Sequence, residues 1–174
     1  MLGVAVSTAV PAVGSTCPHI VPGVGAASTQ AWVNPYLAIE SLNRLRSGAD
    51  APTALAEALR ADDSRELRQI GLVDAAGGAA SWSGPACTPW FGDLTGEGWA
   101  IQGNMLTGPE VLDAMRDAFL GAETPRLPNV WFWRWNPGKP PGATSAASNP
   151  PRCRSTGLRT IRPSISASMS IHTR

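Results

Sequence analysis

The chain has 174 residues and a formal net charge of +1, and this near-neutral total hides two unlike segments. Residues 1–128 carry seven arginines and all 13 acidic residues, whereas residues 129–174 carry seven basic residues and no acid. The length is sufficient for one domain with a substantial core. We therefore divide the chain at the change in composition, into a domain at 1–128 and a tail at 129–174.

The counts of reactive residues exclude several classes of site. The body has one histidine, His19, which excludes multi-histidine zinc sites, and the only lysine, Lys139, lies in the tail, which excludes a P-loop in the body. The cysteines Cys17, Cys87 and Cys153 form no C-x-x-C pair and are typical of reduced thiols. No apolar run reaches the ~18–20 residues of a membrane span. We expect a cytoplasmic protein with no metal, no cofactor and no membrane contact.

The first half of the body predicts two strands followed by two helices. Residues 2–7 are short and β-branched, and residues 23–30 are rich in small side chains, so both favour strands. The Asn-Pro pair at 34–35 predicts a helix cap, and the helix that it opens ends at Gly48. A second short helix is predicted after Asp50.

The second half of the body predicts a hairpin, a strand and a helix. Residues 67–74 and 79–83 flank an A-A-G-G turn, which is typical of a β-hairpin. Residues 84–98 predict a loop, residues 99–103 a strand, and T-G-P-E at 107–110 a capping box before a helix. This order of elements predicts an α+β fold rather than a doubly wound sheet.

Neutral amides at the ends of two predicted strands form the candidate pocket. Gln102, Gly103 and Asn104 lie close to a predicted helix start, where side-chain amides can donate hydrogen bonds to a developing oxyanion. Gln30 and Asn34 form a similar pair after another strand. A polar strand-to-helix turn explains residues 102–104 equally well, and a helix cap explains Asn34 more simply.

Three other features favour structural roles. Cys87 would be a nucleophile only with His19 beside it, and nothing in the sequence brings the two together, so a buried structural cysteine is the favoured interpretation. Asp62, Asp63 and Glu66 are interpreted as a solvated helix end. The four tryptophans of the body are assigned to packing.

Several motifs occur in the order of one family. They are L-G-V-A-V-S at 2–7, P-G-V-G-A-A-S-T-Q-A at 22–31, N-P at 34–35, R-Q-I-G-L-V-D at 68–74, A-C-T-P-W-F-G at 86–92 and G-E-G-W-A-I-Q-G-N-M-L at 96–106. With these motifs the chain resembles the bacterial and archaeal domain-of-unknown-function 1028 proteins, which belong by fold to the N-terminal-nucleophile (Ntn) hydrolase superfamily. The resemblance covers residues 2–127 and implies an αββα four-layer sandwich, incomplete in this chain. It implies no substrate.

The sequence departs from the family at both ends. Ntn catalysis uses a terminal Thr, Ser or Cys whose α-amine acts as base, and family members carry a Thr/Ser-containing strand before the L-G-V-A-V element, where this chain begins Met1-Leu2. Back-translation of residues 138–151 and 157–172 in a second frame gives strings that resemble the family's C-terminal portion. We therefore expect a chain truncated at its N-terminus and frame-shifted after about residue 128, which its coding DNA would test directly.

Three functions follow for comparison. The first is an Ntn-hydrolase-like protein whose full-length relatives hydrolyse amide bonds, with this chain inactive and its ligand a small peptide or amide. The alternative is a non-catalytic module on the same fold that binds peptide or cell-wall fragments. A third, a basic tail that binds nucleic acid, predicts only weak, salt-sensitive binding, and a frame shift removes its basis, so we expect no nucleic-acid partner. The sequence leaves open whether the chain forms a homo-oligomer.

Overall fold

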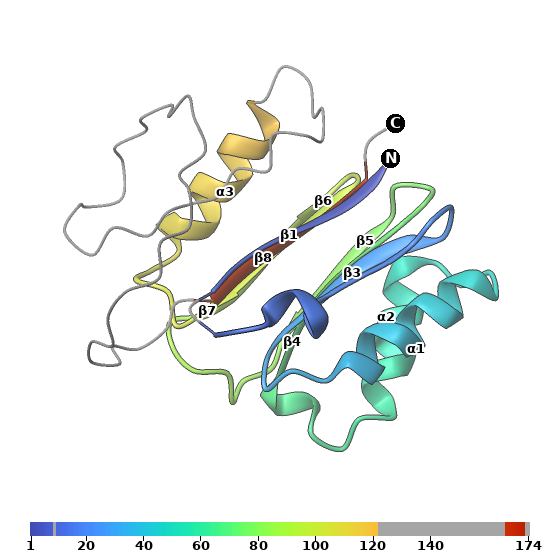
Figure 1. The fold of residues 1–174 in the computed structure, drawn as a ribbon, viewed down its shortest axis with the longest axis horizontal. Helices are drawn as coiled ribbons and strands as arrows, with labels where there is room; N and C mark the ends of the chain where they lie inside the picture. Colours follow the sequence, from blue (N-terminus) through green and yellow to red (C-terminus); the bar gives the residue numbers. More distant parts are fainter. Residues whose placement is uncertain (9, 122–165, 173–174) are drawn as a thin grey trace.

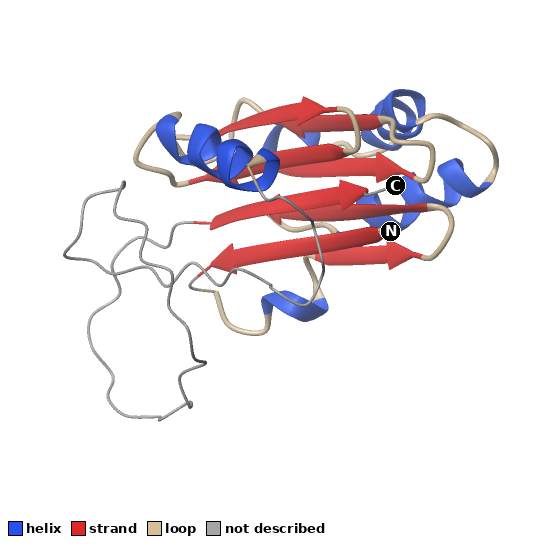
Figure 2. Cartoon of the chain, turned by 90° about the horizontal axis from the view of Figure 1, so that it is seen from above, coloured by secondary structure: helices blue, strands red, loops and turns tan. Residues whose placement is uncertain are grey.

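The fold is known from a computed structural model that describes residues 1–8, 10–121 and 166–172 (Figure 1). Two four-stranded antiparallel sheets, ordered β1-β8-β7-β6 and β2-β3-β4-β5, face one another. Helices α1 and α2 cover the second sheet and α3 covers the first (Figures 1 and 2). The strands are β1 (Leu2–Thr8), β2 (Pro18–Val21), β3 (Gly25–Ala31), β4 (Arg68–Asp74), β5 (Ala79–Ser83), β6 (Gly92–Gly96), β7 (Trp99–Asn104) and β8 (Ser166–His172). The helices are α1 (Pro35–Arg46), α2 (Ala51–Arg60) and α3 (Glu110–Leu120), with single 3-10 turns at Val13–Ser15 and Arg65–Leu67.

The predicted α+β class is confirmed, and the first two helices begin where their caps predict. The Asn34 side chain accepts a hydrogen bond from the Tyr36 N–H at 3.1 Å, and Asp50 accepts one from the Thr53 N–H at 2.8 Å. These bonds satisfy N–H groups that the first turn of a helix leaves without intrahelical partners. Both helices then turn their apolar stripes toward the sheet.

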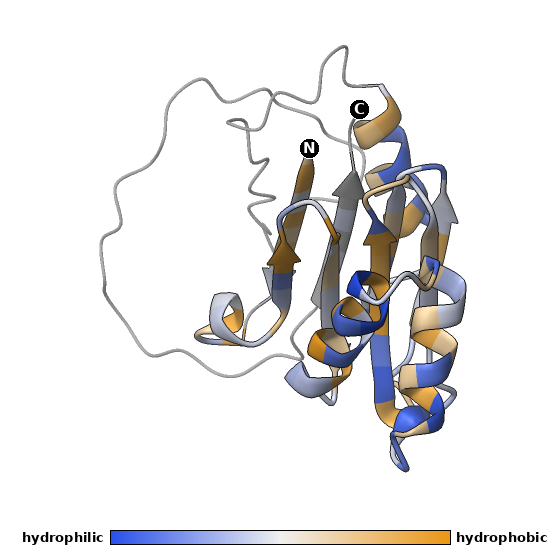
Figure 3. Ribbon diagram, turned by 90° about the vertical axis from the view of Figure 1, so that its right-hand side faces the viewer, coloured by the Kyte–Doolittle hydropathy of each residue, from blue (hydrophilic) through white to orange (hydrophobic). Residues whose placement is uncertain are grey.

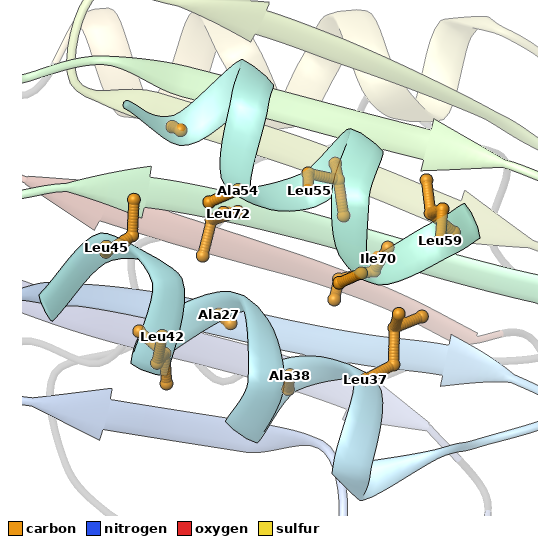
Figure 4. Packing of buried hydrophobic residues seen from close by; sticks show 12 residues of the cluster. Ala27, Leu37, Ala38, Leu42, Leu45, Ala54, Leu55, Leu59, Ile70 and Leu72 are labelled. Carbon is orange, nitrogen blue, oxygen red and sulfur yellow. The ribbon is translucent and has the colours of Figure 1, made fainter. Parts of the chain in front are cut away.

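The largest core cluster lies between these helices and the second sheet. Leucines of α1 and α2 pack on the outward-facing side chains of β3 and β4 (Figure 4). Alternate residues of a strand share one face. Ile70 and Leu72 therefore point to the helices, while Gln69 and Gly71 point to the other sheet. The cluster consists of Ala27, Leu37, Ala38, Leu42, Leu45, Ala51, Ala54, Leu55, Ala58, Leu59, Ile70 and Leu72.

The start of α3 differs from its prediction. The N-cap position is Pro109, which has no side-chain hydrogen bond to the helix, and α3 begins at Glu110. The Thr107 hydroxyl instead contacts the Glu110 carboxylate at 3.1 Å. The capping box predicted at 107–110 is therefore wrong, because α3 begins at Glu110, so Thr107 lies two residues before the N-cap position instead of occupying it.

Three strands were missed, and one of them lies in the predicted tail. β2 has only four residues and begins with a proline, and β6 spans only G-D-L-T-G inside the predicted loop at 84–98, so neither has a strong strand signal. β8 lies between β1 and β7 and pairs with both. Ser166–His172 of the 129–174 tail therefore forms a strand, and the rest of that tail lies outside the described residues.

Candidate functional site

Three buried carboxamides gather at one end of the layer between the two sheets. Gln30 lies one residue before the end of β3 and is paired with Gln69, the second residue of β4, while Asn104 is the last residue of β7. The two glutamines have no exposed surface and Asn104 is 3% exposed. We call this end of the inter-sheet layer the amide end. The opposite end is apolar, because Ala26, Val73 and Ala100 meet there.

Gln69 forms the hydrogen-bonded centre of the amide end. Its Nε2 lies 2.8 Å from the Ser83 hydroxyl, 2.8 Å from the Gly103 carbonyl and 3.2 Å from the Gly92 carbonyl. Its Oε1 accepts a hydrogen bond from Asn104 Nδ2 at 3.0 Å. Because these partners lie on β5, β6 and β7, one side chain on the second sheet is bonded to two strands of the first.

The Gln102 carboxamide uses its donor but not its acceptor in hydrogen bonds. Its Nε2 donates to the Ser28 carbonyl at 2.8 Å and to the Ser168 hydroxyl at 2.9 Å, so it joins β3, β7 and β8. Its Oε1 has no hydrogen-bond partner among the described residues. A Cβ built on Gly71 would lie 2.3 Å from that oxygen, so glycine is needed at position 71 for the two sheets to approach this closely.

Gln30 is the least satisfied polar side chain of the layer. Neither its Nε2 nor its Oε1 has a partner among the described residues, although the side chain is completely buried. The hydroxyl of Ser28, two residues earlier on the same face, is also without a partner in this part of the chain. An unpaired buried amide costs about 1–3 kcal/mol, so Gln30 lowers the stability of the folded state.

The five predicted pocket residues do not form one site. Gln30, Gln102 and Asn104 share the inter-sheet layer, and the Gly103 carbonyl contributes by accepting from Gln69. Asn34 lies elsewhere: its Oδ1 caps α1 and its Nδ2 donates to Asp62 at 2.9 Å. Its helix-cap interpretation was correct, and its place in the pocket was wrong because the chain turns away from the layer after β3.

A network of charged side chains surrounds the turn that follows β3. Arg68 Nε donates to Asp62 Oδ2 at 2.9 Å, and Arg68 Nη1 donates to the Trp32 carbonyl at 2.7 Å. Burial alone would raise the pKa of Asp62, but hydrogen bonds from Arg68, Asn34 and the Ser64 N–H, together with the Arg68 charge, outweigh it and lower the pKa. Asp62 is therefore a structural ion-pair residue with only 10% of its side chain exposed, which corrects the prediction of a solvated helix end at that position.

Neither of the two described cysteines, Cys17 and Cys87, shows a catalytic geometry. Cys87 is buried, and its thiol donates to the Arg68 carbonyl at 3.4 Å, while the His19 ring contacts the Thr16 carbonyl. Burial, and to a lesser extent the negative charge of Asp93, raises the pKa of the Cys87 thiol, and burial also raises that of Cys17. A thiol that is harder to ionise is a poorer nucleophile, so the structural interpretation of Cys87 is confirmed.

The assignment of all four body tryptophans to packing does not hold for Trp32, which is 67% exposed, and Trp90 is also 36% exposed. Trp99 is buried, and Trp82 packs beside the α1–α2 cluster, where its indole N–H donates to the Arg65 carbonyl. Among the described residues, no three histidine, cysteine or acidic side chains gather to hold a metal ion. Nor is any helix of those residues long and apolar enough to cross a membrane.

Comparison with known proteins identifies the family. The sequence profile of a family of unknown function, DUF1028, matches residues 1–130. The chain belongs to the DUF1028 family. The crystal structure of protein SPO2555 from Silicibacter pomeroyi, also a DUF1028 protein, is similar with a TM-score of 0.63 and 28% sequence identity, over 65% of this chain. The chain spans about half the length of that structure, 50% of its residues. A search of curated proteins found no match.

In this DUF1028 chain, sequence reasoning missed Gln69. It lies inside R-Q-I-G-L-V-D, which we interpreted only as a strand of a hairpin. The signal was present, because Gln69 alternates with Ile70 and so occupies the face opposite to the apolar one. A glutamine on the inner face of a strand that is buried on both sides indicates a polar layer, and this part of β4 is buried on both sides.

Proposed function

We propose that this DUF1028 chain is an Ntn-hydrolase-like protein that binds a small peptide or amide at its amide end, and that full-length relatives hydrolyse amide bonds there. The observation that carries the proposal is the buried, unpaired carboxamide of Gln30. A peptide amide offers one carbonyl acceptor and one N–H donor, which match the donor and acceptor of a single carboxamide. Binding of such a ligand would satisfy both groups at once.

The arrangement of layers supports the assignment to this superfamily. Two antiparallel sheets face one another, with α1 and α2 outside one and α3 outside the other (Figure 2). The same order of layers characterises the αββα sandwich that the family resemblance implies. The amide end is where the last residues of β3 and β7 and the first residues of β4 and β8 meet, so a ligand would approach from the end of the strands.

The described hydroxyls at this layer favour binding over turnover in this chain. Ntn chemistry needs an α-amine on the residue that carries the nucleophile. Ser28 and Ser168, whose backbone and side chain respectively contact Gln102, are internal residues whose nitrogens are in peptide bonds. The same observation favours the alternative, a non-catalytic module that binds peptide or cell-wall fragments. The free, buried cysteines Cys17 and Cys87 support a reducing, cytoplasmic setting.

A titration with a blocked amino-acid amide tests the proposal. We expect N-methylacetamide, whose single secondary amide is blocked on both sides, to shift the side-chain NH2 resonances of Gln30, and the Gln30→Leu variant to lose this binding. Its ester isostere, methyl acetate, has no N–H donor and should bind about tenfold more weakly, because the Gln30 oxygen then stays unpaired. Equal binding of ester and amide, or unchanged binding by the variant, would overturn the proposal.

A further inference from the structure

The two sheets are built from the same unit. In each sheet a two-stranded hairpin leads into a helix that covers the sheet, namely β2, β3 and α1 in one and β6, β7 and α3 in the other (Figure 1). The two units keep one constant offset along the chain: Pro18 and Gly92 begin their first strands, and Gly25 and Trp99 begin their second strands. A proline marks the start of each helix at that same offset. The protein therefore contains an internal structural repeat.

The strands that flank each unit repeat as well. One sheet has the order β2-β3-β4-β5, and the other has the matching order β6-β7-β8-β1. β3 lies over β8 in the same way as β7 lies over β4, so an approximate two-fold axis along the strands relates the two halves. Ala31 after Gln30 and Met105 after Asn104 also share a left-handed φ, 61° and 57°, which is uncommon outside glycine. Gln30 and Asn104 are therefore equivalent residues of the two halves.

In one half the carboxamide at this place has a partner. Asn104 Nδ2 donates to Gln69 Oε1, while Gln69 Nε2 lies 2.8 Å from both the Ser83 hydroxyl and the Gly103 carbonyl. An amide NH2 group carries two N–H donors, and two acceptors at this distance employ both of them. We call this arrangement the paired half. It shows how a primary carboxamide is held at this end of the layer: its oxygen accepts from an amide, and its nitrogen donates to two oxygens, one of them a hydroxyl.

In the other half a serine stands at the position of Gln69. Gln30 and Gln69 are paired residues of β3 and β4, and the corresponding pair on β7 and β8 is Asn104 and Ser166. A serine has no carboxamide, and Gln30 has no partner among the described residues although it is completely buried. β1 is hydrophobic over most of its length (Figure 3) but ends in Thr8, which pairs with Ser166 and so has the position that a serine of β5 has in the paired half. This half keeps the amide and the hydroxyl but not the carboxamide between them.

We propose that the ligand of the amide end is a primary carboxamide, as in the side chains of glutamine and asparagine, and that it binds opposite Gln30 in the place that Gln69 has in the paired half. Its oxygen accepts from Gln30 Nε2, and one N–H donates to Gln30 Oε1. Its second N–H donates to the Thr8 hydroxyl, whose oxygen accepts from the Val10 N–H and has a second lone pair. A peptide bond has only one N–H for these two acceptors. The inference rests on the proposed function and narrows it to primary amides.

A comparison of two isomeric amides tests the inference on the unaltered chain. Propionamide has the primary carboxamide of a glutamine side chain, whereas N-methylacetamide has the same atoms arranged as a secondary amide with one N–H. We expect propionamide to shift the side-chain NH2 resonances of Gln30 at about tenfold lower concentration, because it makes one more hydrogen bond. Equal or tighter binding of N-methylacetamide would overturn this inference and leave the proposed function standing. If neither amide bound, the proposed function would fail as well.

Substitutions at Ser166 test where the ligand lies. Ser166→Gln adds a carboxamide at the register position that corresponds to Gln69, so it should pair with Gln30 from within the chain and weaken propionamide binding at least about tenfold. The matched control, Ser166→Ala, adds no carboxamide and should bind propionamide as the unaltered chain does. Undiminished binding by Ser166→Gln, or loss of binding by Ser166→Ala, would place the ligand elsewhere and contradict the inference.

Discussion

Asn104 on β7 donates a hydrogen bond of 3.0 Å to the Oε1 atom of Gln69 on β4, and this bond crosses from one sheet to the other. Apolar side chains pack without direction, but a bond between two carboxamides fixes both the separation and the relative position of the sheets. The amide end is therefore more rigidly specified than the apolar end around Val73 and Ala100. Gln30, beside Gln69, shares this environment without sharing its bonds.

Replacing each glutamine by leucine should have opposite effects on stability. Gln30→Leu removes two unpaired polar groups and is expected to raise the free energy of unfolding by about 1 kcal/mol. Gln69→Leu removes the acceptor of Asn104 and the side-chain donor to the Gly103 carbonyl, and is expected to lower the free energy of unfolding by about 3 kcal/mol. Urea unfolding of both variants measures the difference.

The comparison controls for the volume and shape of leucine, because both residues are glutamines, both are completely buried, and they are paired neighbours on adjacent strands. Equal destabilisation by the two substitutions would show that Gln30 is held by bonds as Gln69 is. In that case its carboxamide would not be available to a ligand.

Asp62 should make the stability of the chain depend on acidic pH. Its pKa is lowered in the folded state, so its ion pair with Arg68 contributes fully above the unfolded pKa of about 3.9 and is lost as the pH falls through the lower, folded pKa. Asp62→Asn is expected to cost about 2 kcal/mol at neutral pH and little in strong acid. Thermal unfolding across this pH range measures the convergence of the two curves.

The neighbouring Asp63→Asn variant is the control for the removal of one charge, because Asp63 is exposed. It should change the free energy of unfolding by less than about 0.5 kcal/mol. If both variants lowered the stability equally at neutral pH, the effect would come from net charge rather than from the pair with Arg68.

The sequence predicted elements with strong local signals and missed those defined by tertiary pairing. Asn34 and Asp50 mark helix starts through bonds within four residues, so their effect is readable locally. β6 and β8 have no such signal, because both owe their strand conformation to β7. Gln102 and Asn104 lie in the inter-sheet layer and Asn34 does not. Position along a strand can be inferred from the local sequence, whereas the turn that follows β3 depends on Arg68, which is 36 residues away from Trp32.

Cys17 and Cys87 should react slowly while the chain is folded. Both thiols are buried with raised pKa values, so little thiolate is present or accessible at neutral pH. We expect iodoacetamide to alkylate both at least about tenfold more slowly in buffer than in urea. A Cys153→Ser background, with alkylated peptides identified by mass spectrometry, assigns the reaction to each site. Rapid alkylation of Cys87 in buffer would instead indicate an activated thiol.

The contribution of β8 can be tested at its centre. Ser168 faces the inter-sheet layer, where its hydroxyl accepts from Gln102, and its backbone lies between Val6 of β1 and Gln102 of β7. Ser168→Ala removes only the hydroxyl and should cost about 1 kcal/mol. Ser168→Pro also removes a backbone donor from a central strand, which sheets do not accommodate.

Hydrogen exchange should separate these two variants of Ser168. In Ser168→Pro we expect the amides of β1 and β7 to lose protection while those of β3 and β4 keep theirs, because β8 is the only described strand that joins β1 to the rest of its sheet. Ser168→Ala should retain protection throughout. If the proline variant kept β1 protected, a partner other than β8 would hold that strand, and the sheet order at this edge would have to be revised.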